Sequence, residues 1–136
     1  MTMKFKLFTL FAFTTSLSAC QIISPIFVDY YDVRMDVAKW INRHQLLSMQ
    51  QKRSLVQLTR AQQKLYNIES IPEEQKIQIA RENSIAMYCA ELHLSQRKIK
   101  QLQNIIFDEA EQQLIFTFYD QKFPKIKLDI NNIQCD

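Results

Sequence analysis

The fold is decided by residues 48–67, SMQQKRSLVQLTRAQQKLYN. The apolar residues here and just beyond keep the three- and four-residue steps of one helix face: Leu55, Leu58, Leu65 and Ile68. Ser48 and Gln51 have the spacing of a capping box, in which each side chain bonds the backbone N–H of the other residue. Asn67 suits the left-handed conformation that closes a helix. The stretch therefore predicts an amphipathic helix over 49–67.

The flanking stretches predict further helices of the same kind. Pro25 suits the first turn of a helix, and apolar residues continue at helical steps over about 26–45. A third helix is expected from Glu73, where acidic residues favour a helix start, to about His93. Ser95 is a candidate cap for a fourth helix.

Beyond Phe107 the pattern changes. Residues 114–119, LIFTFY, are β-branched and aromatic, and residues 125–130, KIKLDI, alternate polar with apolar. Both favour strands, which a loop over 120–124 would join as an antiparallel hairpin on the helices. Continuation of the fourth helix to Tyr119 is the alternative. The predicted fold class is mainly α (α+β): three to four amphipathic helices with a short C-terminal β-hairpin, in one small domain.

The N-terminus has the pattern of a secretory signal peptide. Lys4 and Lys6 precede the apolar run 7–13, and small polar residues follow it. A transmembrane helix needs roughly 20 apolar residues. The run is too short to span a bilayer, so the sequence predicts a segment that is read by the export machinery and removed.

The signal ends in Leu17-Ser18-Ala19-Cys20, which resembles the lipobox of bacterial lipoproteins. This resemblance implies cleavage before Cys20, diacylglycerol on its sulfur and usually a third acyl chain on the new amino terminus. Two or more acyl chains anchor a protein stably. The next residue, Gln21, is not the aspartate that favours inner-membrane retention in enteric-type envelopes, so the expected location is the outer membrane, facing the periplasm. The alternative is an ordinary signal peptide with a coincidental cysteine.

These boundaries divide the chain into a signal peptide over 1–19, an acylated N-terminus and short tether over 20–25, and one domain over 26–136. The precursor charge of +3 falls to +1 when Lys4 and Lys6 leave with the signal, so nothing favours nucleic acid as a partner. The chain has no glycine, which excludes Walker, Rossmann and nucleophile-elbow motifs as usually written.

Two cysteines remain after Cys20, and an even pair in an oxidising compartment favours a disulfide between Cys89 and Cys135. Cys89 and His93 also have the spacing of two metal ligands on one helix face, although structural zinc usually needs four ligands. Two free thiols are a further alternative.

Three further groups of side chains could have a function, but a structural role explains each of them better. They are the three aspartates Asp29, Asp32 and Asp36, the basic stripe Arg53, Arg60 and Lys64, and the aromatic residues Phe27, Tyr30, Tyr31 and Trp40. The aspartates and the basic stripe are typical of solvated helix faces. The aromatic stripe is typical of a core, with a ligand groove or bilayer contact as alternatives.

The sequence assigns no catalytic residue, metal ligand or cofactor. The expected contact of the protein with the membrane is through lipid on Cys20. The expected function is therefore non-enzymatic: a lipid-anchored module that contacts another envelope protein, as an assembly or adaptor component. The alternative is a small ligand-binding or lysozyme-inhibitor-like periplasmic protein.

Overall fold

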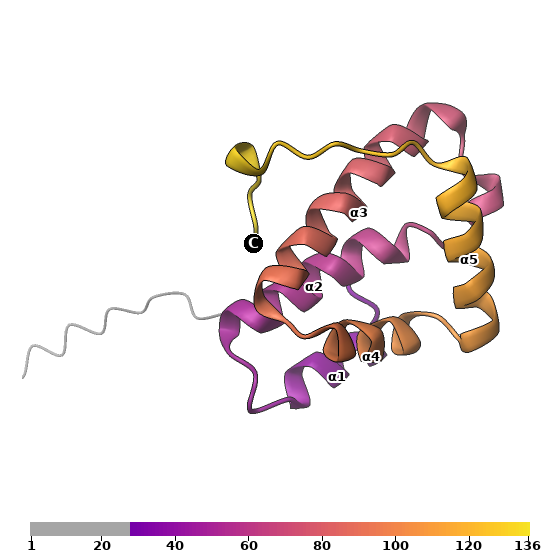
Figure 1. Ribbon diagram of the computed structural model, residues 1–136. Coiled ribbons are helices and arrows are strands. Elements are labelled where there is room, and N and C mark those ends of the chain that lie inside the picture. The colour runs from indigo at the N-terminus through magenta and orange to yellow at the C-terminus, as the bar shows by residue number, and fades with distance from the viewer. Residues whose placement is uncertain (1–27) are drawn as a thin grey trace, which may run out of the picture.

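A computed structural model describes residues 28–136, which form one small, mainly helical domain (Figure 1). The helices of this part of the chain are α1 (Met35–Arg43), α2 (Met49–Gln63), α3 (Glu73–His93), α4 (Gln96–Ile106) and α5 (Glu109–Lys122), with short 3-10 turns η1 (Ile68–Ser70) and η2 (Ile130–Asn132). The predicted signal peptide, the lipid site at Cys20 and the tether lie outside the described residues.

Helices α2 and α3 form the centre of the domain and run antiparallel, side by side (Figure 1). The start of α2 meets the end of α3, where the Gln51 side chain donates to the His93 carbonyl over 3.0 Å. The predicted capping box is confirmed, because the Ser48 hydroxyl accepts from the Gln51 backbone N–H at 3.1 Å. Asn67 takes the predicted left-handed conformation, with φ 53°, so the chain turns sharply between the two helices.

The core lies between this pair and α4, with α1 closing one side. Its fully enclosed side chains come from several helices and the following turns: Val37, Ile41, Leu55, Leu58, Leu65, Leu102, Ile106 and Phe107. The predicted cap of α4 is confirmed, since the Ser95 hydroxyl accepts from the Lys98 backbone N–H over 3.2 Å. Apolar burial across four elements therefore holds the helices together.

The prediction of a first helix over 26–45 was wrong at its start, because α1 begins only at Met35. Local side-chain bonding competes with the helix here: the Asp29 carboxylate accepts from the Tyr31 backbone N–H over 2.9 Å. Asp32 then takes a left-handed conformation with φ 58°, which a helix cannot include.

Arg34 fixes the entry into α1. Its backbone N–H donates to Gln63 Oε1 over 2.8 Å, and its guanidinium donates to the carbonyl of Ile106 over 2.9 Å. The same guanidinium also bonds the Ile105 carbonyl and the Tyr66 hydroxyl. A cation thus satisfies the unpaired carbonyls at the end of α4 and ties three elements together.

The predicted β-hairpin was also wrong, and the alternative of a fourth helix extended to Tyr119 did not hold either. Residues 114–119 lie in a separate helix, α5, and within residues 28–136 the chain forms no strand. Asp108 begins this helix, since its carboxylate accepts from the Glu111 backbone N–H over 2.8 Å. Residues 124–129 are extended but pair with no other segment described in the structure.

Tertiary packing overrides strand propensity in α5. Ile115, Phe116, Tyr119 and Phe123 follow a helical stripe that faces the core, and Ile115 and Phe123 are buried. The Phe107 and Phe116 rings meet edge to face, with centroids 5.7 Å apart. In a strand Phe116 and Tyr119 would lie on opposite faces, whereas in the helix both are half-buried on the side that faces the core.

Candidate functional site

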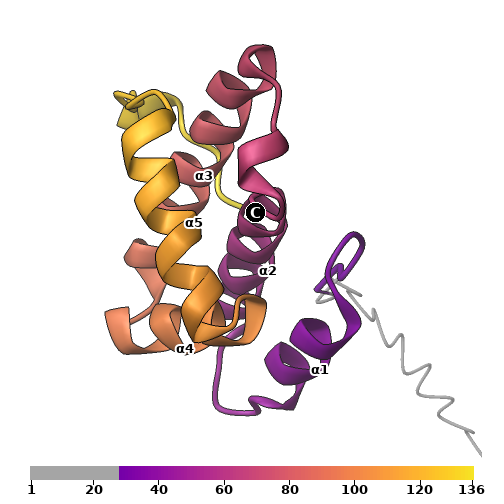
Figure 2. The same ribbon diagram turned by 90° about the vertical axis from the view of Figure 1, so that its right-hand side faces the viewer.

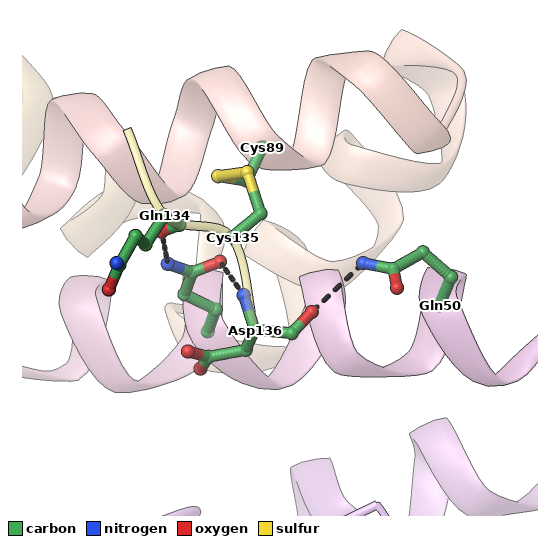
Figure 3. Close-up of a disulfide and its surroundings, with 6 residues drawn as sticks. Gln50, Cys89, Gln134, Cys135 and Asp136 are labelled. Carbon is green, nitrogen blue, oxygen red and sulfur yellow. Dashed lines mark hydrogen bonds between the residues drawn. A yellow bond between two sulfur atoms is a disulfide. The ribbon is translucent and has the colours of Figure 1, made fainter. Parts of the chain in front are cut away.

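The predicted cysteine pair is brought together. Cys89 near the end of α3 and Cys135 in the C-terminal tail form a disulfide, with their Cα atoms 5.6 Å apart (Figure 3). Cys89 is fully buried, so this linkage enters the core. The alternative of Cys89 and His93 as metal ligands is not what the structure contains, because the Cys89 sulfur is already bonded.

Side chains of α2 hold the tail beside the disulfide. Gln50 donates to the Asp136 carbonyl over 2.9 Å, and the Gln57 amide bonds both the Gln134 carbonyl at 3.5 Å and the Asp136 N–H at 3.4 Å (Figure 3). The last residues therefore lie across the α2–α3 pair.

The three aspartates do not share a helix face. Asp29 and Asp32 precede α1, while Asp36 lies in its first turn and is ion-paired with Arg34 at 2.5 Å. This pairing lowers the pKa of the Asp36 carboxyl, chiefly through the hydrogen bond from Arg34. The carboxylates of Asp29 and Asp36 thus make separate local contacts, with the Tyr31 N–H and with Arg34 respectively.

The basic stripe on α2 organises chain segments. The Arg60 guanidinium donates to the Tyr31 carbonyl over 2.7 Å and to the Asp29 carbonyl over 2.8 Å, and it lies 3.7 Å from the Asp136 carboxylate. Lys64 is ion-paired with Glu82 of α3. These cations hold the segment before α1, the tail and α3 against α2.

The aromatic stripe is divided between the core and the surface. Trp40 and Tyr30 are half-buried against the core, and the Lys98 ammonium lies 5.6 Å from the centre of the Trp40 ring. Tyr31 is exposed, and Phe27 lies outside the described residues. The predicted aromatic residues therefore do not line one groove.

A pocket of ≈560 Å³ opens where α3, α5 and the tail approach one another. Its volume is within the roughly 300–1,000 Å³ typical of small-molecule sites. The lining residues come from α2 and the turn after it, α3, α4, α5 and the tail: Gln62, Leu65, Asn83, Ser84, Met87, Tyr88, Glu91, Gln103, Phe116, Tyr119, Asp120 and Leu128. The tail contributes Leu128, so the disulfide-bonded segment forms part of the wall.

Two buried amide residues are among those that line this pocket. Asn83 is 7% exposed and donates to the carbonyls of Ala61 and Ile79, at 3.0 and 3.1 Å. Gln62 is 2% exposed, and its Oε1 accepts no hydrogen bond from the described residues. An unsatisfied buried acceptor costs about 1–3 kcal/mol. A ligand that donates an N–H or O–H to this oxygen would remove that cost.

The remaining polar groups of the lining are three hydroxyls, two carboxylates and the Gln103 amide. Burial raises the pKa of Tyr119, which keeps its hydroxyl protonated, and a hydrogen bond with Ser84 acts against this rise. Glu91 and Asp120 lie at the exposed edge, where Asp120 is ion-paired with Lys125 and Glu91 accepts from Gln96. Together with the apolar walls, these groups suit a ligand with an apolar body and hydrogen-bond donors.

The sequence alone does not reveal this pocket, because its lining comes from helices far apart in the chain. One available signal was Asp108-Glu109-Ala110-Glu111, an acidic cap followed by helical spacing of aromatic residues, which would have identified α5. The contacts of Arg34 with partners outside α1 had no such signal, since these partners lie 29 to 72 residues away.

The chain matches no protein-family model, no curated protein and no solved structure. Within residues 28–136, no three His, Cys, Asp or Glu side chains gather closely enough to hold a metal ion. None of the helices described here combines the length and apolarity needed to cross a bilayer.

Proposed function

We propose that this chain is a lipid-anchored bacterial envelope protein that acts as a non-enzymatic binding module on the periplasmic face of the outer membrane. The lipobox-like Leu17-Ser18-Ala19-Cys20 supports the anchor, and Gln21 supports sorting to the outer membrane. The anchor would keep the domain close to the bilayer, because only a few residues separate Cys20 from Val28.

The pocket favours a small ligand as the bound species. It combines apolar walls, including Phe116 and Leu128, with the buried and unsatisfied Gln62 oxygen. Pockets of this kind use apolar contacts for affinity and a few polar groups for orientation. The ligand class is a small, largely apolar molecule that carries an N–H or O–H donor.

An assembly or adaptor role is the second candidate, and exposed apolar side chains support it. Residues with more than half of their surface exposed occur on the helices around the pocket: Ile77, Leu92 and Leu114. Aliphatic side chains of this size are candidates for the buried centre of a protein interface.

The lipid anchor is tested by replacing Cys20 with alanine. We expect Cys20→Ala to abolish labelling by a palmitate analogue and to leave an uncleaved or differently cut precursor, while Cys135→Ala keeps the label. Membrane fractionation of the native protein should recover most of it with the outer membrane. Label on the Cys20→Ala protein, or a mainly inner-membrane distribution, would contradict the respective part of the proposal.

Ligand binding is tested with N-phenyl-1-naphthylamine, a neutral apolar fluorophore that carries an N–H. A version of the chain that starts at Gln21 should bind one probe per molecule, with a rise in fluorescence. Leu128→Trp narrows the pocket and should weaken binding, whereas Ile130→Trp, at an exposed position in the same tail, should not. Equal binding by both variants would show that the probe sits elsewhere.

A further inference from the structure

The segment nearest the predicted anchor exposes large apolar side chains. Tyr31 is 73% exposed, Met35 is 68% exposed and Leu46, in the loop after α1, is 101% exposed. Lys39 and Arg43 are also exposed and follow Met35 at four-residue steps, so these three share one stripe of α1. We name Tyr31, Met35, Lys39, Arg43 and Leu46 the α1 face.

Helix α1, which carries the middle of this set of residues, belongs to the side of the domain that lies away from the pocket. Helix α1 contacts α2 and α4 but not α5. In Figure 2, α1 and the segment before it stand at one edge of the bundle, while α5 occupies the opposite edge. The apolar residues of the α1 face are therefore not covered by the domain's own helices.

The length of the tether limits what this face can meet. Val28 lies eight positions after Cys20, and a fully extended chain spans at most about 3.3–3.6 Å per residue, roughly 28 Å in total. A domain held this closely has its N-terminal segment within reach of the bilayer surface at all times. Neighbouring apolar and basic side chains suit that surface, because apolar groups enter the interface and cations approach lipid phosphates.

We propose that the α1 face docks on the lipid surface and orients the domain so that the pocket points away from the membrane. The inference rests on the proposed anchor at Cys20. Tyr31, Met35 and Leu46 enter the interfacial region, and Lys39 and Arg43 contact phosphate groups.

The neighbouring carboxylates oppose this docking only weakly. Asp36 is ion-paired with Arg34, and Asp29 lies 3.7 Å from the Arg60 guanidinium. Asp32 adds a negative charge beside the face. Apolar insertion therefore provides most of the binding, and the two cations contribute less.

The test uses the mature lipoprotein in vesicles of phosphatidylethanolamine and phosphatidylglycerol that contain a phospholipid with a photoreactive diazirine in its acyl chain. After illumination, mass spectrometry should find lipid adducts on Tyr31, Met35 and Leu46. Leu114 is the matched control, since it is 72% exposed and belongs to α5, the helix at the opposite edge of the bundle. It should carry little label.

A double variant, Met35→Gln with Leu46→Gln, should lower the yield of labelled Tyr31 by at least about ten-fold, because it removes two side chains that bury apolar area. Leu114→Gln should leave that yield unchanged. Equal labelling of Met35 and Leu114 on protein that floats with the vesicles would overturn the docking face alone. Protein that does not float with the vesicles would overturn the anchor, and the docking face with it.

Discussion

The α2–α3 pair and the C-terminal tail over 123–136 lie side by side but are stabilised in different ways. The helices bury Leu55, Leu58 and Ala90 completely or nearly so, and each satisfies its own backbone hydrogen bonds. Within residues 124–129 the tail pairs with no strand. It is held by the packing of Phe123 and Ile126, the disulfide, amide contacts from α2 and the Arg60–Asp136 ion pair.

This difference shows what extended backbone needs when it has no neighbouring strand. A helix needs only an apolar stripe and a surface that accepts it. The tail has polar backbone groups that water or side chains must satisfy, so its order comes from a covalent bond at one end and a buried aromatic ring at the other. Stability should therefore vary along the chain.

Removing a buried side chain from the α2–α3 pair should cause the largest loss of stability. Leu58→Ala removes a side chain with no exposed surface from the centre of α2 and should lower the free energy of unfolding by about 2–5 kcal/mol. Urea denaturation followed by circular dichroism measures this loss. Leu46→Ala is the matched control, because Leu46 is exposed, and it should change stability by no more than about 0.5 kcal/mol.

Opening the disulfide that holds the C-terminal tail should cause a smaller and more local loss of stability. Cys135→Ser opens a linkage between residues 46 positions apart and should lower the free energy of unfolding by at most about 4 kcal/mol. Cys89→Ser should cost a similar amount, and the double variant little more. Hydrogen exchange should show faster exchange after Phe123 and retained protection in α2 and α3. Full alkylation of both cysteines without reductant would show that the bond is absent from the native protein.

In the chain, helix α5 lies between the α2–α3 pair and the tail. Its N-terminal cap offers a test of how much one local contact contributes to stability. Asp108→Ala removes the carboxylate that accepts from the Glu111 N–H and should cost about 1 kcal/mol of unfolding free energy. Asp120→Ala removes an exposed ion pair with Lys125 and should cost at most about 1 kcal/mol, typically less. Equal losses in thermal denaturation would argue against a specific capping role.

The smallest expected effect is a loss of stability at alkaline pH. Burial raises the pKa of Tyr119 above 10.0, so the folded state holds this proton more tightly than the unfolded state. The resulting stability is complete below about pH 10, the unfolded pKa, and is lost as the pH rises through the folded value. Urea titrations between pH 8 and pH 12 should show a shallower decline for Tyr119→Phe than for the native chain.

Signals confined to a few neighbouring residues were predicted well. The capping box at Ser48 and Gln51, the cap at Ser95 and the left-handed Asn67 all hold in the structure. The strand prediction for 114–119 failed because β-branched and aromatic residues at this density fit either a strand or a buried helix face. Only the surface formed by α4 and η1, together with the contact of the Tyr119 hydroxyl with the Ala80 carbonyl of α3, selects the helix.

The sequence by itself determined where α2, α3 and α4 begin, because helix caps and apolar periodicity depend on residues within four positions of one another. It also paired Cys89 with Cys135, since no other cysteine follows Cys20. The tertiary structure decided the Arg34 contacts, the helical state of α5 and the pocket between α3, α5 and the tail. Each depends on groups that lie far apart in the chain and meet only after the helices have packed.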